Sequence, residues 1–141
     1  MAKVTAGERK FVIERASSCC EYCWSQLDFS PSPFAIEHII PLIKNGTDNL
    51  DNLAFSCSGC NGHKYDCTDA YDPVSGELVP LYHPRQQLWS SHFVWSVDFA
   101  EIIGTSPIGR ATIARLCLNR QGVINFRRVL STMNLHPPRL Y

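Results

Sequence analysis

CEYC at residues 20–23 and CSGC at residues 57–60 decide the fold of this chain of 141 residues. Zinc prefers four thiolates in a tetrahedron, and two residues between paired cysteines let one tight turn present both sulfurs to one ion. A four-thiolate shell leaves no open position, so such a site is structural rather than catalytic. We therefore predict one structural zinc ion on Cys20, Cys23, Cys57 and Cys60. The alternative is four reduced thiols that pack as small hydrophobic side chains.

The other cysteines stand outside these pairs. Cys19 competes with Cys20 as a ligand, but only Cys20 has the two-residue spacing to Cys23. Cys67 and Cys117 are isolated in sequence, and we expect them to be buried free thiols. The total of seven is odd, and the first residues lack the apolar run of a signal peptide. Metal binding is therefore favoured over a disulfide scaffold, and we expect a cytoplasmic protein without a membrane segment.

Between the two pairs, the sequence predicts two strands and a turn. Phe34–Ile40 is short, apolar and β-branched around Glu37 and His38. Asn45-Gly46 is a turn dipeptide, and Leu53–Ser56 is a second short apolar run. Periodicity, caps and turn residues predict further elements, so the class is α+β. These are helices at Ala6–Ser18, from Asn61 toward Cys67, from Pro107 to about Asn119 and at Val123–Met133, and a hairpin of His92–Asp98 and Glu101–Gly104.

The chemistry-bearing residues follow one order. Glu37-His38 precedes Ile39-Ile40-Pro41, the Gly46 turn and Asn52-Leu53 follow, and Asn61 and Lys64 come directly after the second cysteine pair. Here the sequence resembles the HNH endonuclease family. That family has an acid–His pair before Ile-x-Pro, a Gly-containing turn, Asn-Leu before a cysteine pair, and then Asn or His followed by Lys. The resemblance spans about Arg9 to Asp66.

The resemblance implies a ββα-metal, treble-clef-like core. In such a core, two strands and a helix surround a divalent cation, and a separate structural zinc ion stabilises the fold. His38 would be the general base, and Asn52 would hold its ring through a hydrogen bond. Glu37 and Asn61 would bind the catalytic cation. Oxygen ligands favour Mg²⁺ or Mn²⁺ over metals that prefer nitrogen.

The same resemblance extends to substrate and domain organisation. Lys64 would touch a phosphate, and His63 could be a further ligand or contact DNA. Residues 1–70 would form the core, and residues 71–141 a small α/β extension packed on it. The implied activity is hydrolysis of DNA that leaves a 5′-phosphate and a 3′-hydroxyl. A non-catalytic zinc module that binds nucleic acid or protein, and an RNA-directed nuclease, are the alternatives.

Charge is distributed unevenly although the formal net charge is zero. Residues 105–141 contain six arginines and no Asp, Glu or Lys, so this region favours a polyanionic partner. We expect Arg127 and Arg128 to contact the nucleic-acid backbone. The alternative is that these two arginines lie on the solvent-exposed face of the last helix and bind nothing. Trp89, Phe93 and Trp95 are expected in the core, and nothing in the sequence indicates an oligomeric state.

Overall fold

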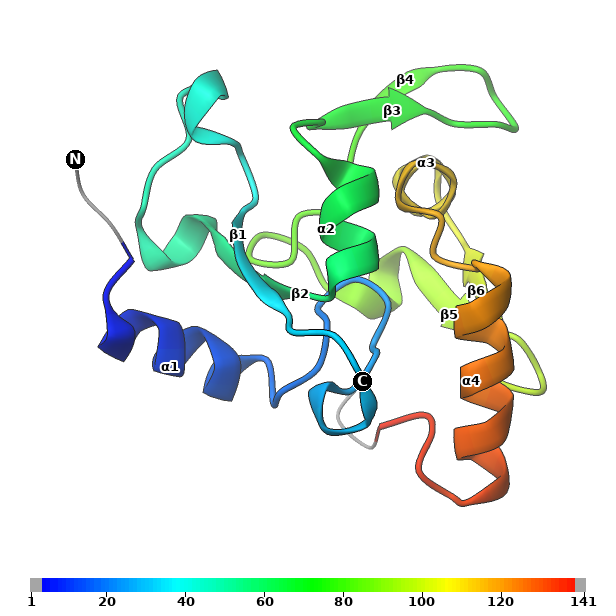
Figure 1. The fold of residues 1–141 in the computed structure, drawn as a ribbon. Helices are drawn as coiled ribbons and strands as arrows, with labels where there is room; N and C mark the ends of the chain where they lie inside the picture. Colours follow the sequence, from blue (N-terminus) through cyan, green and yellow to red (C-terminus); the bar gives the residue numbers. More distant parts are fainter. Residues whose placement is uncertain (1–3, 139–141) are drawn as a thin grey trace.

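The computed structural model describes residues 4–138, and it combines four α-helices with three two-stranded antiparallel sheets over that range (Figure 1). No helix between residues 4 and 138 is long and apolar enough to cross a membrane. The elements are α1 (Ala6–Arg15), β1 (Ala35–His38), β2 (Leu53–Ser56), α2 (Ser58–Lys64), β3 (Asp69–Tyr71), β4 (Leu78–Pro80), β5 (Phe93–Trp95), β6 (Ile102–Gly104), α3 (Pro107–Leu116) and α4 (Gln121–Thr132).

Helix α1 leads the chain into the first cysteine pair. Thr5 and Glu8 form a capping box at its start: Thr5 Oγ1 accepts from the Glu8 amide at 3.1 Å, and Glu8 Oε1 accepts from the Thr5 amide at 3.0 Å. The helix ends earlier than predicted, because Ser17 and Ser18 adopt left-handed backbone angles, with φ of 52° and 57°. These two residues turn the chain toward Cys20.

Strands β1 and β2 lie at the centre of the view in Figure 1 and pair antiparallel, with His38 opposite Leu53. Both strands fall within the predicted ranges. The chain passes from β2 directly into α2, whose first turn is capped by Cys57: its Sγ accepts from the Cys60 amide at 3.4 Å. The sequence predicts that this helix begins at Asn61, but the cap starts α2 earlier, at Ser58. Cys60, Asn61 and Lys64 therefore share one helix.

The core surrounds this hairpin and the cysteines. It includes Val12 of α1, Phe55 of β2 and an aromatic group from the C-terminal half. In that group, Trp89 stacks on Phe93 with ring centroids 5.1 Å apart, which confirms the predicted core role of both. Trp95 is only partly buried and packs against the same core.

The C-terminal half contains one predicted hairpin and one that was missed. β5 and β6 pair as expected, and Ser106 caps α3 by accepting from the Gly109 amide at 3.0 Å. β3 and β4 pair on either side of the turn at Asp72–Gly76, where the sequence analysis predicted no strands. Arg110 of α3 donates to both Asp72 oxygens, at 2.9 and 2.8 Å, and this guanidinium holds the pKa of Asp72 well below its usual range.

Helices α3 and α2 pack together, so the C-terminal half rests on the helix that follows the second cysteine pair. Cys67 and Cys117 were expected to be buried, but the structure places both as half-buried thiols.

Candidate active site and metal centre

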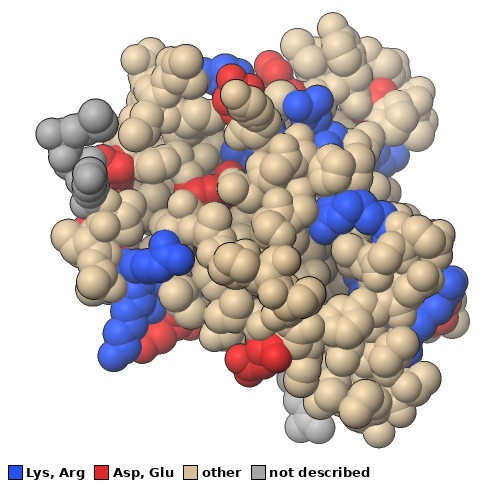
Figure 2. Space-filling model, viewed as in Figure 1, with Lys and Arg blue, Asp and Glu red and all other residues tan. Residues whose placement is uncertain are grey.

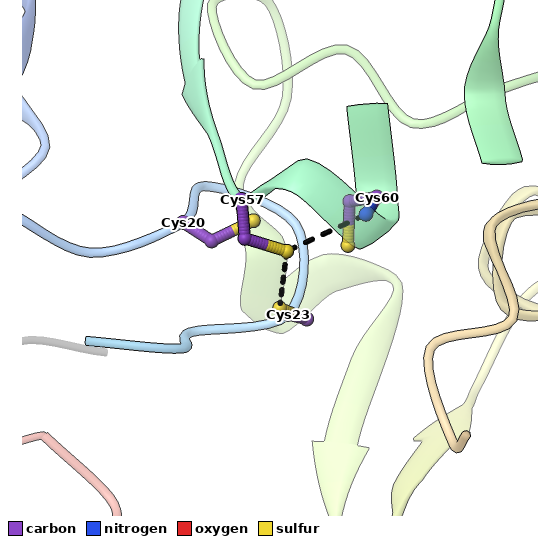
Figure 3. Close-up of side chains that lie close together, drawn as sticks. All are labelled: Cys20, Cys23, Cys57 and Cys60. Carbon is purple, nitrogen blue, oxygen red and sulfur yellow. Dashed lines mark hydrogen bonds between the residues drawn. The ribbon is translucent and has the colours of Figure 1, made fainter. Parts of the chain in front are cut away.

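Four cysteines from two distant segments converge on one point (Figure 3). The Sγ atoms of Cys20, Cys23, Cys57 and Cys60 all lie within 4.8 Å of one another. Zinc–sulfur bonds of about 2.3 Å in a tetrahedron place sulfurs about 3.8 Å apart. The Cys23 and Cys57 sulfurs are 3.6 Å apart, so the cluster fits a metal ion such as zinc. Cys19 lies outside it, since its thiol donates to the Ser17 carbonyl at 3.4 Å.

A positive charge lies beside this cluster. Arg120, from the loop before α4, places Nη2 at 3.9 Å from the Cys57 sulfur and Nη1 at 4.0 Å from the Cys60 sulfur. A Cβ on Gly59 would come within 2.6 Å of that guanidinium, so glycine allows the approach. Burial lowers the pKa of Arg120, but the adjacent thiolates raise it by more. The guanidinium therefore offsets the net charge of about −2 that a zinc ion with four thiolates carries.

Glu37, His38 and Asn61 share one open cleft of about 380 Å³. The first two residues belong to β1 and the third to α2, and Tyr65 lines the cleft just beyond that helix. The structure thus brings together three residues that the sequence selected for catalysis. The cleft is open to solvent, so a polymeric substrate could reach the His38 ring.

His38 has a different partner from the one expected. Its Nε2 lies 2.7 Å from Asp48 Oδ1. Asn52 does not bind the ring: its Oδ1 accepts from the Ile40 amide at 2.9 Å, and its Nδ2 donates to the carbonyls of Ile40 and Thr47 at 2.9 and 2.8 Å. The predicted Asn52–His38 hydrogen bond is therefore wrong, because the buried amide satisfies the backbone of the loop that carries Asp48.

Glu37 lies in a buried network. Only 6% of it is exposed; the Tyr22 hydroxyl donates to one carboxylate oxygen, and Lys64 Nζ lies 3.2 Å from the other. Lys64 is 1% exposed and also donates to the Ile39 carbonyl at 2.9 Å. Burial raises the pKa of Glu37, and the Lys64 charge opposes that rise. The expectation that Lys64 touches a phosphate is wrong, because its ammonium is used inside the protein.

The donor set at this cleft suits a hard cation. Each oxygen of a carboxylate has two lone pairs, and the contacts with Tyr22 and Lys64 use one on each oxygen of Glu37. The Asn61 side chain adds an amide on the same cleft wall. Carboxylate and amide oxygens are the ligands that Mg²⁺ and Mn²⁺ accept. A cation here would share the Glu37 carboxylate with the Lys64 ammonium.

Replacing Lys64 by methionine should destabilise the protein by about 3–5 kcal/mol, because it leaves the buried Glu37 carboxylate without its cation. Urea unfolding of the variant and the parent measures this loss. Lys10→Met is the matched control, since Lys10 and Glu14 form an exposed pair 3.9 Å apart, and it should cost less than about 1 kcal/mol. Equal small losses in both variants would contradict a buried Glu37–Lys64 pair.

The remaining predicted contacts to nucleic acid are dispersed. His63 is exposed on α2, and it is not among the residues that line the cleft. Arg127 is 4% exposed and donates to the carbonyls of Ala100 and Leu118 at 2.9 and 2.8 Å, so its predicted role in binding is wrong. The Arg128 side chain is 57% exposed. Figure 2 shows that basic side chains on the viewed face are separated by other residues and form no single patch.

The two neighbouring arginines should therefore behave differently. Arg127→Ala should lower the free energy of unfolding by about 3 kcal/mol, since a buried charged donor and its bonds are lost. Arg128→Ala should leave stability unchanged and, where Arg128 contacts a phosphate, reduce the slope of log affinity against log salt by about 0.9. Urea unfolding and DNA binding over a salt series measure the two effects. A stable Arg127→Ala variant would contradict the structural role.

Comparison with known proteins agrees with this geometry. A family model described as HNH endonuclease matches residues 20–66, about one third of the chain. This match confirms the resemblance inferred from the motifs, and the family indicates nuclease activity. The matched segment contains all four clustered cysteines together with Glu37, His38 and Asn61. No curated protein matches the chain.

Proposed function

We propose that this chain, which carries an HNH endonuclease domain at residues 20–66, is a metal-dependent endonuclease that hydrolyses phosphodiester bonds in DNA. The observation that carries the proposal is the shared cleft of Glu37, His38 and Asn61, in which Asn61 directly follows Cys60 of the four-cysteine cluster on α2. A general base next to oxygen ligands for a cation is what water-dependent cleavage of a phosphodiester requires.

The proposed core is a ββα-metal unit within residues 1–70, with residues 71–141 as an extension packed on it. Support comes from the β1–β2 hairpin, which leads directly into α2, and from the cysteines at the start of that helix. The four cysteines would hold a structural zinc ion. Such an ion supplies folding free energy, since the ligands are brought together only in the folded chain.

Glu37 and Asn61 would hold the second metal, Mg²⁺ or Mn²⁺. Bound there, the cation would neutralise charge on the scissile phosphate and on the leaving oxygen. The neutral imidazole of His38 accepts a proton from water as the water oxygen bonds to phosphorus. The bond from phosphorus to the 3′ oxygen breaks, and that oxygen takes a proton from solvent. The products carry a 5′-phosphate and a 3′-hydroxyl.

Asn52 would support this reaction by hydrogen-bonding to the backbone of the loop between β1 and β2, and not by hydrogen-bonding to the His38 ring. Its hydrogen bonds to Ile40 and Thr47 connect the segment just after β1 to the later part of the loop that precedes β2. That connection keeps His38 and Asp48 at a fixed separation.

Cleavage of matched substrates tests the proposal. End-labelled duplex DNA, single-stranded DNA and RNA of one sequence are incubated with the zinc-loaded protein and Mg²⁺ or Mn²⁺, and the product ends are mapped. DNA products with 5′-phosphate ends are expected. If RNA is cleaved and DNA is not, the proposed substrate is wrong. If nucleic acid is bound but not cleaved, the proposed enzymatic activity is wrong, and the chain is a zinc-dependent binding module.

A further inference from the structure

The loop between β1 and β2 presents one acidic side chain to the His38 ring. Asp48 Oδ1 lies 2.7 Å from His38 Nε2, and the two side chains are 21% and 26% exposed. The motifs that single out His38 in the sequence do not include Asp48. The contact between Asp48 and the His38 ring is seen only in the structure.

The loop is built so that Asp48 stays in this place. Asn52 Nδ2 donates to the carbonyl of Thr47, the residue before Asp48, at 2.8 Å. Gly46 packs directly on the segment that follows β1, where a Cβ would come within 1.7 Å of the Ile40 carbonyl oxygen. Only glycine permits that approach. These contacts fix the backbone of Gly46 and Thr47, the two residues before Asp48, and so hold the carboxylate at the His38 ring.

The contact determines which ring nitrogen is free. A carboxylate accepts hydrogen bonds, so a neutral His38 places its proton on Nε2 and donates it to Asp48. Nδ1 then carries the lone pair. A base that must remove a proton from water needs that lone pair at a fixed position, and a ring without a partner divides between two tautomers and several orientations.

We propose that Asp48 is the positioning residue for His38, which selects the Nε2–H tautomer and leaves Nδ1 as the proton-accepting atom. The inference rests on the proposed nuclease function for its catalytic consequence, but the tautomer itself does not depend on activity. Asp48 acts through His38 and has no direct contact with substrate in this account. Loss of such a partner typically lowers activity about ten- to hundredfold.

The matched variants are Asp48→Ala and Asp51→Ala. Asp51 lies in the same loop and is exposed, so its replacement controls for the loss of one negative charge near the cleft. Asp48→Asn is a second variant that keeps the side-chain size and removes the charge. Zinc content and thermal unfolding establish that each full-length variant is folded.

The first measurement is the ¹⁵N chemical shifts of the His38 ring, recorded over a pH series in the zinc-loaded, magnesium-free protein. We expect the Nε2–H tautomer in the parent and in Asp51→Ala, and a mixture in Asp48→Ala. A purely structural role for Asp48 would not change this tautomer. The same tautomer in Asp48→Ala and in the parent would overturn the proposal.

The second measurement is DNA cleavage under saturating and limiting substrate. Asp48→Ala should lower kcat about ten- to hundredfold with KM within about twofold, and Asp48→Asn should lie between it and the parent. Unchanged kcat in both Asp48 variants would overturn the proposal. A parent that cuts no nucleic acid would instead contradict the proposed function, and the ring shifts would still decide the role of Asp48 in orienting His38.

Discussion

His38→Ala will lower the rate of DNA cleavage at least about a hundredfold, the usual contribution of a general base. The ring lies in the cleft with Glu37 and Asn61, and no other histidine lines that cleft in the described part of the chain. A methyl group can neither accept a proton from water nor bond to Asp48. Fold and zinc content should be retained, because His38 is partly exposed and is not one of the clustered cysteines.

Initial rates on one duplex substrate, compared at equal zinc content, measure this loss. His83→Gln is a suitable control, since His83 is also half-buried and does not line the cleft. It should cut DNA at the parent rate. A His38→Ala variant with the activity of the parent would remove His38 from the mechanism.

Loss of one clustered cysteine should have the largest effect on stability. Cys20→Ser and Cys57→Ser should each release the zinc ion and unfold most of the chain. Apparent binding free energies of structural zinc, about 10–16 kcal/mol in small zinc peptides, match or exceed the whole stability of a typical domain, about 5–15 kcal/mol. The cluster also connects α2 to the first cysteine loop and to Arg120, so both halves of the chain depend on it.

Metal analysis and thermal unfolding test this expectation. The parent should carry about one zinc ion per chain and lose its fold when the ion is removed by a chelator. Cys117→Ser is the control, because Cys117 is half-buried and lies outside the cluster. It should keep zinc and unfold at the parent temperature. Folded, active parent protein without zinc would contradict the structural role of the metal.

The local part of this fold was accessible from sequence because its signals are local. Two C-x-x-C pairs predict a shared cluster wherever the chain brings them together, and the four sulfurs do lie within 4.8 Å. Ser106 with Pro107 marks the start of α3, and short apolar runs mark β1 and β2. For α3, β1 and β2, one segment carries enough information to specify its own structure, and each cysteine pair likewise indicates half of the cluster.

The roles of long charged side chains were not accessible, because they depend on distant residues. Nothing near Lys64 indicates that its ammonium will pair with Glu37, and the burial of Arg127 requires the carbonyls of Ala100 and Leu118 around it. Asn52 was assigned to the His38 ring by resemblance, but the loop backbone offered it three closer partners. Side-chain partners of this kind become visible only when the chain is folded.

The most direct test of the account is cleavage of a supercoiled plasmid by the zinc-loaded parent protein, with Mg²⁺, with Mn²⁺ and with neither. The account predicts conversion to nicked or linear DNA only when a divalent cation is added, with 5′-phosphate ends, and at least a hundredfold slower conversion by His38→Ala. Conversion at the same rate without added cation, or no conversion under any of these conditions, would contradict a cation-dependent DNA nuclease built on Glu37, His38 and Asn61.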